Sequence, residues 1–220
     1  MTFEEKIDLF IDYLSNYKTN SDTFNPWRDF DSVYDYNSSA PSVRCKNLRE
    51  YLLARKSSKI ILIAEALSYQ GGKFTGIAMT SEKLLSIRTS NPVADLGNAS
   101  RKKNGFSENT ASIVEKVLIH DLQLNPVNFV KWNTYPFHPH RMDNMLSNRT
   151  PTNEEILASK HILQQFLEIF QNKRIVAVGN IAHQTLTKFF PEHSAEKVRH
   201  PAYGGDKDFA IGIKKIIVNI

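Results

Sequence analysis

The sequence predicts an α/β fold in three layers, with helices on both sides of a central four-stranded parallel sheet. Three short apolar runs, at residues 60–63, 127–132 and 174–178, have the length and composition of buried strands, and residues 196–199 predict a shorter fourth one. Longer segments with apolar residues at helical spacing separate these runs. This alternation is typical of a parallel sheet, because parallel strands need crossover connections. We expect residues 1–220 to form one domain.

The N-terminal region, up to residue 58, predicts a helix and an aromatic loop that pack on this domain. Thr2 and Glu5 form a capping box ahead of apolar residues at helical spacing. Residues 25–44 mix aromatic and polar side chains, which favours a loop held on the surface by its rings. A short helix at 47–56 then leads into the first strand.

The rest of the chain continues the alternation of helices and strands. A helix around residues 84–87 precedes a long, basic loop at 90–107. Ser107 is the expected cap of a helix that ends near residue 122, and Thr152 with Glu155 forms a second capping box for a helix that ends near residue 170. Helices at 181–190 and 206–215 flank the last strand.

Composition limits the class of protein. Hydrophobic residues make up 41% and charged residues 23% of the chain, which is usual for soluble globular proteins. Neither a membrane span nor a signal segment is recognisable, so we expect a cytoplasmic, monomeric protein. The lone cysteine, Cys45, excludes an internal disulfide and a cysteine-ligated centre. His138 and His140 lack a third ligand at motif spacing, so neither a metal nor a cofactor is expected.

The excess of basic residues favours a partner that carries phosphate groups. The net charge is +5 and the pI is near 9.2. Within the loop at 90–107, the triplet Arg101, Lys102 and Lys103 has the charge needed to contact a phosphate chain. A solvated loop tip without any partner is the alternative.

Polar side chains follow three of the predicted strands directly. Glu65 comes after the first strand, Asn133 after the second, and His200 after the last. Because the carboxyl ends of parallel strands meet at one edge of a sheet, ligands bind there in open α/β folds. We therefore expect the segments that carry these residues to lie at one edge of the sheet, and the family resemblance described next implies that the three residues line one site.

These segments resemble the uracil-DNA glycosylase superfamily, specifically its small bacterial branch without an iron-sulfur cluster. The most specific part of the resemblance is Trp132-Asn-Thr-Tyr-Pro-Phe-His-Pro-His140, followed by Leu146-Ser-Asn-Arg-Thr-Pro-Thr152. Segments 176–179, 198–201 and 204–205 follow in the family's order. The resemblance implies a uracil-DNA glycosylase-like fold, and cleavage of the N-glycosidic bond of a base flipped out of DNA.

The chemistry of that reaction suits the three residues. Breaking the bond leaves negative charge on the base and positive charge on the sugar, so a site needs a donor on one side and an anion on the other. By the resemblance, His200 donates to a carbonyl oxygen of the base, and Glu65 faces the sugar and a water molecule. Asn133 offers a donor and an acceptor to the base edge. No lysine in these motifs is an obvious nucleophile, so base removal without strand cleavage is expected.

The remaining site candidates surround these three residues. Met79, Tyr69 and Ala66 are expected to contact the base. Tyr203 lies where the superfamily carries the residue that fills the gap left by the flipped nucleotide, and the alternative is a ring packed on its own loop. The other residues expected to contact DNA are Arg199, Gly204, Arg101, Lys102 and Lys103.

The sequence departs from the family in its first motif. Where the family has Gly-Glu-Ala-Pro-Gly, this chain has Ala64-Glu-Ala-Leu-Ser68, and Ala78-Met79 replaces the family's Pro-Phe. A flexible thioether thus replaces a rigid ring. Two explanations are open: a domain that only binds DNA, or a pocket reshaped for a base other than uracil. We favour the second, with a modified pyrimidine such as glucosylated hydroxymethylcytosine of viral DNA as a possible target and a defence enzyme as the corresponding role.

A nucleotide-phosphate enzyme on a doubly wound fold is disfavoured. Gly71-Gly72-Lys73 lacks the spacing of a phosphate-binding loop, and no Gly-x-Gly-x-x-Gly segment occurs.

Overall fold

A four-stranded parallel sheet forms the centre of the protein in a computed structural model that describes residues 1–87 and 96–217. Its strands, in spatial order, are β3 (Phe129–Asn133), β2 (Ile60–Ala64), β5 (Arg174–Val178) and β6 (Ala195–Val198). Ile60 lies opposite both Phe129 and Arg174, so β3, β2 and β5 start level. The predicted fold class is confirmed.

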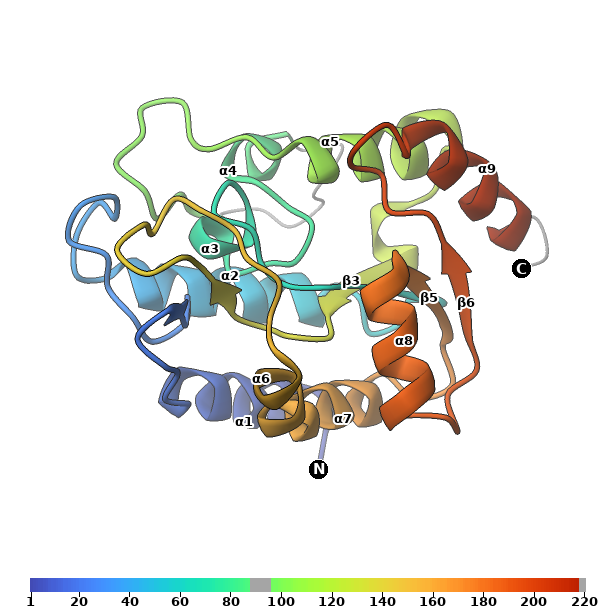
Figure 1. The fold of residues 1–220 in the computed structure, drawn as a ribbon, viewed down its shortest axis with the longest axis horizontal. Coiled ribbons are helices and arrows are strands. Elements are labelled where there is room, and N and C mark those ends of the chain that lie inside the picture. The colour runs from blue at the N-terminus through green and yellow to red at the C-terminus, as the bar shows by residue number, and fades with distance from the viewer. Residues whose placement is uncertain (88–95, 218–220) are drawn as a thin grey trace.

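Helices cover both faces of this sheet. They are α1 (Phe3–Asn16), α2 (Ala40–Leu53), α3 (Gly72–Thr75), α4 (Glu82–Leu85), α5 (Asn109–Glu115), α6 (Asn153–Ala158), α7 (Lys160–Ile169), α8 (Asn180–Phe189) and α9 (Asp206–Ile217). A π-helical segment, η1 (Lys116–Asp121), continues α5, and a 3₁₀ turn, η2 (Pro126–Asn128), precedes β3. In Figure 1, α5 and α9 lie above the sheet, whereas α1 and α7 lie below it. None of the helices in the described part of the chain has the length and apolar character of a membrane-spanning segment.

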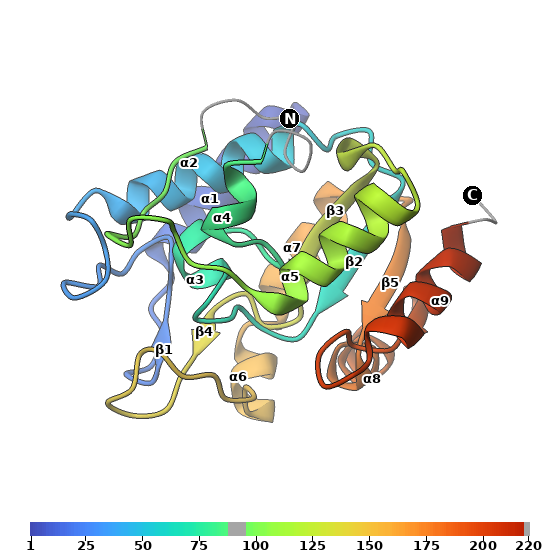
Figure 2. The same ribbon diagram turned by 90° about the horizontal axis from the view of Figure 1, so that it is seen from above.

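Alternation along the strands divides the apolar core into two layers. Ile61 and Ile63 of β2 pack with α1, α2, α7 and α8, while Ile60 and Leu62 pack with α5, η1 and α9. Successive side chains of a strand point to opposite faces, so a strand covered on both sides must be apolar throughout. The view from above in Figure 2 shows α5 and α9 side by side on the second face.

Several boundaries differ from the prediction. The helix expected at 47–56 is α2 and begins at Ala40, because Pro41 in its first turn is compatible with a helix start. The single helix expected up to residue 170 is divided into α6 and α7 at Ser159, whose hydroxyl donates to the carbonyl of Glu155. A short antiparallel pair, β1 (Thr23–Phe24) with β4 (His138–Pro139), was not predicted. Residues 90–95 of the predicted basic loop lie outside the described residues.

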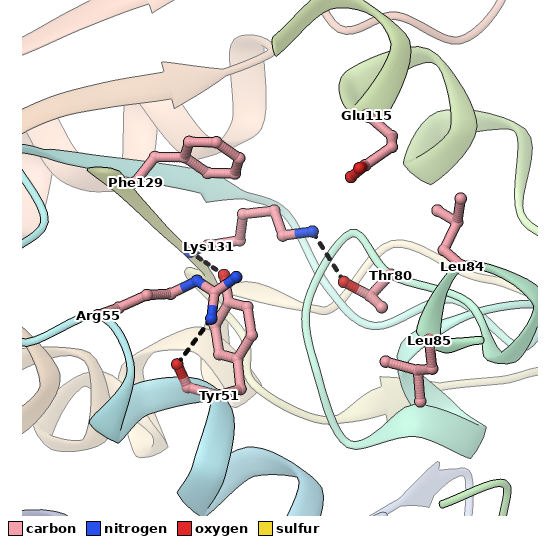
Figure 3. Close-up of a pocket in the computed structure, with 8 residues that line it drawn as sticks. All are labelled: Tyr51, Arg55, Thr80, Leu84, Leu85, Glu115, Phe129 and Lys131. Atoms are coloured by element: carbon pink, nitrogen blue, oxygen red, sulfur yellow. Dashed lines mark hydrogen bonds between the residues drawn. The ribbon is translucent and has the colours of Figure 1, made fainter. Parts of the chain in front are cut away.

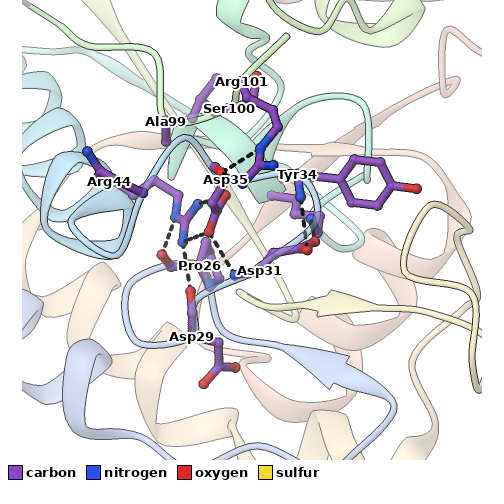
Figure 4. Close-up of polar contacts among 12 residues, drawn as sticks. Pro26, Asp29, Asp31, Tyr34, Asp35, Arg44, Ala99, Ser100 and Arg101 are labelled. Carbon is purple, nitrogen blue, oxygen red and sulfur yellow. Dashed lines mark hydrogen bonds and ion pairs between the residues drawn. The ribbon is translucent and has the colours of Figure 1, made fainter.

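The loop before α2 is held by a buried ion pair more than by its rings. Phe30 and Tyr36 are exposed, and only Trp27 enters the core. The guanidinium of Arg44 donates to both carboxylate oxygens of Asp35, at 2.7 and 3.1 Å, and both side chains are fully buried. Figure 4 shows this pair at the centre of a group of backbone carbonyls from the same loop.

Candidate active site

An open hollow of about 740 Å³ lies at the carboxyl edge of the sheet. Most of its lining comes from four segments: residues 64–68 at the end of β2 and beyond it, 108–110 at the start of α5, 148–150 before α6, and 200–204 after β6. Volumes of roughly 300–1,000 Å³ hold small-molecule ligands in proteins, so the hollow has room for a nucleobase and its substituents. The predicted ligand edge therefore carries a cavity.

Glu65 lines this hollow directly after β2. Its backbone carbonyl accepts hydrogen bonds from the Tyr135 amide at 2.9 Å and from the Thr134 hydroxyl at 3.0 Å, which joins the ends of β2 and β3. Burial raises the pKa of the Glu65 carboxyl, and a hydrogen bond with Thr150 opposes that shift. The carboxyl is thus held at a partly buried position that faces the cavity.

His200 lines the same hollow from the segment after β6. The amide of Ala202 donates to its Nδ1 at 3.1 Å, so the proton of the neutral ring is on Nε2. Burial, and the nearby charge of Arg199, lower the pKa of His200 and favour this neutral form. Gly179, with φ +93, lies so close that a Cβ there would be 3.1 Å from the Cβ of His200. The ring is therefore a neutral donor in a fixed place.

Asn133 ends β3 but does not line the hollow. It is 1% exposed, and neither Nδ2 nor Oδ1 of its amide has a hydrogen-bond partner. Ala64, its partner across the sheet, does line the hollow. Buried amides are rarely left without partners, so this one has donor and acceptor capacity that no described protein group uses. The structure brings Glu65 and His200 together on one hollow, whereas Asn133 is buried beside the lining residue Ala64 and is not part of the lining.

Met79 lines the hollow and has a left-handed backbone, with φ +47. Lys131 supports this turn, because its Nζ donates to the Met79 carbonyl at 2.9 Å and to the Thr80 hydroxyl at 2.8 Å. Burial lowers the pKa of Lys131 to about 8. In Figure 3 its amine points to Thr80, with Glu115 on the other side of a small second cavity. A buried lysine thus shapes one wall of the hollow.

Tyr203 and Gly204 form the rim of the hollow. Tyr203 is 100% exposed, and both residues have left-handed backbones, with φ +54 and +73. A bulky residue in this conformation is uncommon and costs energy. The ring projects into solvent and does not pack on its own loop. Arg199, next to this segment, is also exposed.

The other predicted residues are divided between the hollow and its surroundings. Ala66 lines the hollow, whereas Tyr69 does not; its amide donates to Asn148 Oδ1 at 3.0 Å. Arg101 donates to the carbonyls of Ser32 and Asp35 and so holds the N-terminal loop.

The two lysines that follow Arg101 lie outside the hollow. Lys102 lies over the Phe106 ring, with its Nζ 4.4 Å from the ring centroid, and Lys103 is exposed.

His138 has a structural environment. Its ring nitrogens lie 3.0 Å from the Leu67 carbonyl oxygen and 3.1 Å from that of Met145, and burial lowers its pKa to about 4. Among the described residues, no group of three or more His, Cys, Asp or Glu side chains is placed to hold a metal ion.

Sequence reasoning missed Glu108, which lines the hollow from the N-cap position of α5. An acidic residue before a helix normally indicates a cap, so no sequence signal distinguished it. Residues 148–150 were part of a recognised motif, but no role was assigned to them.

Comparisons with known proteins agree with this arrangement. The model of the uracil DNA glycosylase superfamily matches residues 53–212. The crystal structure of wild-type SMUG2 from Pedobacter heparinus is similar over 100% of both chains, with a TM-score of 0.64 at 14% sequence identity. No curated protein matches the sequence. Since the family match covers most of the chain and includes Glu65, Asn133 and His200, the protein belongs to the uracil DNA glycosylase superfamily.

Proposed function

We propose that the protein is a monofunctional DNA glycosylase that hydrolyses the N-glycosidic bond of a flipped-out pyrimidine and leaves an abasic site. The observation that carries the proposal is the meeting of Glu65 and His200, 135 positions apart by their numbers, on one hollow at the carboxyl edge of the sheet. The membership of a DNA glycosylase superfamily supports the same reaction class.

His200 stabilises the departing base in this proposal. Negative charge develops on the pyrimidine as the bond breaks, and a neutral Nε2–H donor aimed at a carbonyl oxygen lowers the barrier. The hydrogen bond from Ala202 to Nδ1 keeps the proton on Nε2 without a positive charge on the ring. Glu65 acts on the opposite side, where its carboxylate stabilises the cationic sugar and orients the attacking water.

Asn133 and Met79 form the base-binding part of the site. In this proposal the unpartnered amide of Asn133 pairs with the edge of the base, and the flexible side chain of Met79, which lines the hollow, packs against the base. Tyr203 stacks in the gap that the flipped nucleotide leaves, because its ring is fully exposed beside the hollow.

We expect removal of the base without strand cleavage, because strand cleavage needs a free lysine amine as nucleophile in the site and the two buried lysines are engaged elsewhere. Lys131 is tied to Met79 and Thr80, and Lys73 to Asp31 at 2.6 Å. Neither amine lines the hollow.

The altered first motif favours a modified pyrimidine over uracil. Loss of the family's proline and phenylalanine removes rigid groups, and the open hollow leaves room for a substituent on the ring. Since modified pyrimidines of this kind occur in viral DNA, the corresponding biological role is defence against viruses.

The test uses purified protein and duplex and single-stranded oligonucleotides that carry one uracil, hydroxymethylcytosine or glucosylated hydroxymethylcytosine. Alkali converts abasic sites into strand breaks, which a gel resolves. Glu65→Gln and His200→Ala should each lower the rate about 100-fold or more while DNA binding persists. Glu192→Gln, a change of an exposed residue outside the hollow, is the matched control.

Each outcome of this test decides between the candidate functions. Release of uracil alone would exclude the modified-base preference. Binding of DNA without release of any base would identify a non-catalytic binding module instead.

A further inference from the structure

We propose that Glu108 is a specificity residue that accepts a hydrogen bond from the exocyclic amino group of the bound base, so that the site selects cytosine-type over uracil-type pyrimidines. The inference rests on the proposed function and names its substrate class. It starts from a carboxylate that lines the hollow together with Glu65, Met79 and His200 and that the reaction itself does not use.

The contacts of Glu108 leave one of its carboxylate oxygens without a protein partner. It occupies the N-cap position of α5 but makes no capping hydrogen bond, although helix N-termini favour acidic partners. The residue is only partly buried, yet its Oε2 atom is shielded from solvent and has no hydrogen-bond partner. Ser68 forms a hydrogen bond with the carboxylate.

The position of this carboxylate is set by close packing. A Cβ on Gly71 would lie 2.0 Å from Glu108 Oε2 and 2.7 Å from the Thr80 carbonyl oxygen. Gly71, half of the glycine pair that follows the first strand, thus leaves the space that Glu108 occupies. A carboxylate confined in this way can discriminate between donors and acceptors on a ligand.

Asn133 alone cannot provide that discrimination. Since neither its Nδ2 nor its Oδ1 is held by a protein group, the amide can turn over to match either a cytosine or a uracil edge. A carboxylate cannot turn into a donor while it is ionised. Glu and Asp side chains accept from the amino group of cytosine, whereas a carbonyl oxygen at the same position would face their lone pairs.

Ser68 and Lys131 keep Glu108 partly ionised. Asn133 and Lys131 lie two residues apart on β3 and so point to the same face of the sheet, the face that α5 covers. Burial raises the pKa of Glu108 to about 7, while the hydrogen bond with Ser68 and, to a smaller extent, the charge of Lys131 oppose that rise. Above neutral pH, Glu108 is therefore an acceptor with an unused oxygen.

The test compares bases that differ only in this one group. Oligonucleotides carry cytosine or uracil, and hydroxymethylcytosine or hydroxymethyluracil, and kcat/KM is measured for each. The wild-type protein should prefer the amino member of each pair by about 10-fold or more. Glu108→Gln, whose amide can donate as well as accept, should lower this ratio by about 10-fold, whereas Glu192→Gln should leave it unchanged.

The pH dependence of the same kcat/KM ratio distinguishes recognition of the base by Glu108 from a purely structural role, because a structural role would leave the ratio independent of pH. The ratio should rise as the pH increases through about 7 in the wild type and stay flat in Glu108→Gln. Of the groups near Glu108, Ser68 does not titrate in this range and Lys131 has a pKa of about 8. Titration of Glu65 and His200 affects both members of a pair, so the ratio cancels it.

Three results would overturn the inference. The first is a Glu108→Gln variant with the same kcat/KM ratio as the wild type, and the second is a Glu108→Gln variant that loses rate equally on both bases of a pair. The third is a wild-type protein that prefers the carbonyl base of each pair, with that preference abolished in Glu108→Gln. If the wild type releases no base at all, the proposed function fails. The ratio is then taken from dissociation constants of the same oligonucleotides, and equal ratios in the wild type and Glu108→Gln would overturn the role of Glu108 separately.

Discussion

Replacement of Arg44 by methionine tests whether the buried ion pair with Asp35 holds the N-terminal loop. The Arg44 guanidinium donates to both Asp35 oxygens, to the Asp29 carbonyl at 2.7 Å and to the Pro26 carbonyl. Methionine fills similar space but donates nothing. In this variant the Asp35 carboxylate would keep one hydrogen-bond donor, the Asp31 amide at 2.9 Å. It would be a buried negative charge with no positive partner.

The expected loss of stability follows from the burial of both partners. Both side chains are 0% exposed, and removal of one partner of a buried pair costs about 3–5 kcal/mol. That is a large part of the roughly 5–15 kcal/mol that stabilises a folded domain. For a chain of this size it lowers the melting temperature by about 6–20 °C.

Urea unfolding followed by tryptophan fluorescence measures this loss, because Trp27 and Trp132 stack in the core with ring centroids 5.9 Å apart. Addition of Asp35→Asn to Arg44→Met removes the unpaired charge and should recover about 1 kcal/mol or more. Arg28→Met, which breaks an exposed pair with Asp29, is the matched control and should cost less than about 1 kcal/mol. A cost below about 1 kcal/mol for Arg44→Met, or strict additivity with Asp35→Asn, would refute the reasoning.

Three further predictions concern the site and its surroundings. Tyr203→Gly should raise the free energy of unfolding by about 1 kcal/mol, since glycine tolerates φ +54. The same change should weaken DNA binding, because the ring that fills the gap left by the flipped nucleotide is gone. A variant that is less stable, or that binds DNA as well as the wild type, would contradict this role of Tyr203. Joint replacement of Lys102 and Lys103 by alanine should reduce the slope of log K against log salt by about 2 in binding titrations, and an unchanged slope would exclude them from the interface. Because the pKa of His200 lies below its ordinary 6.5, turnover should fall as the pH drops through that lowered pKa, where protonation of Nδ1 breaks the bond from Ala202; a rate that rises with acidity would indicate a charged donor.

The His200 shift also has a consequence for stability. Its pKa is lower in the folded than in the unfolded chain, so the unfolded state binds more protons between the two values. The free energy of unfolding therefore falls as the pH decreases below about 6.5, in addition to the loss of turnover.

Local patterns were enough to predict the fold and the place of the site. A strand covered on both faces must be apolar throughout, so residues 60–63 were recognisable without any neighbour. Glu65 and His200 were predicted from their place directly after strands, because parallel strands expose their carboxyl ends at one edge. Both line the hollow.

Contacts between distant segments decided the rest. Arg101 has the sequence context of a DNA-binding residue, yet it donates to carbonyls of a loop more than 60 residues earlier. Asn133 ends its strand close to where Glu65 follows its own, but packing buries it outside the lining of the hollow. The acidic residue before α5, Glu108, has the local pattern of a helix cap, and only the fold shows that it lines the cavity. Periodic patterns and helix caps depend on residues that are neighbours along the chain, so the sequence shows them directly. Whether a single polar side chain faces a cavity, the core or a distant loop depends on how segments far apart in the sequence pack together, and the sequence alone does not show this.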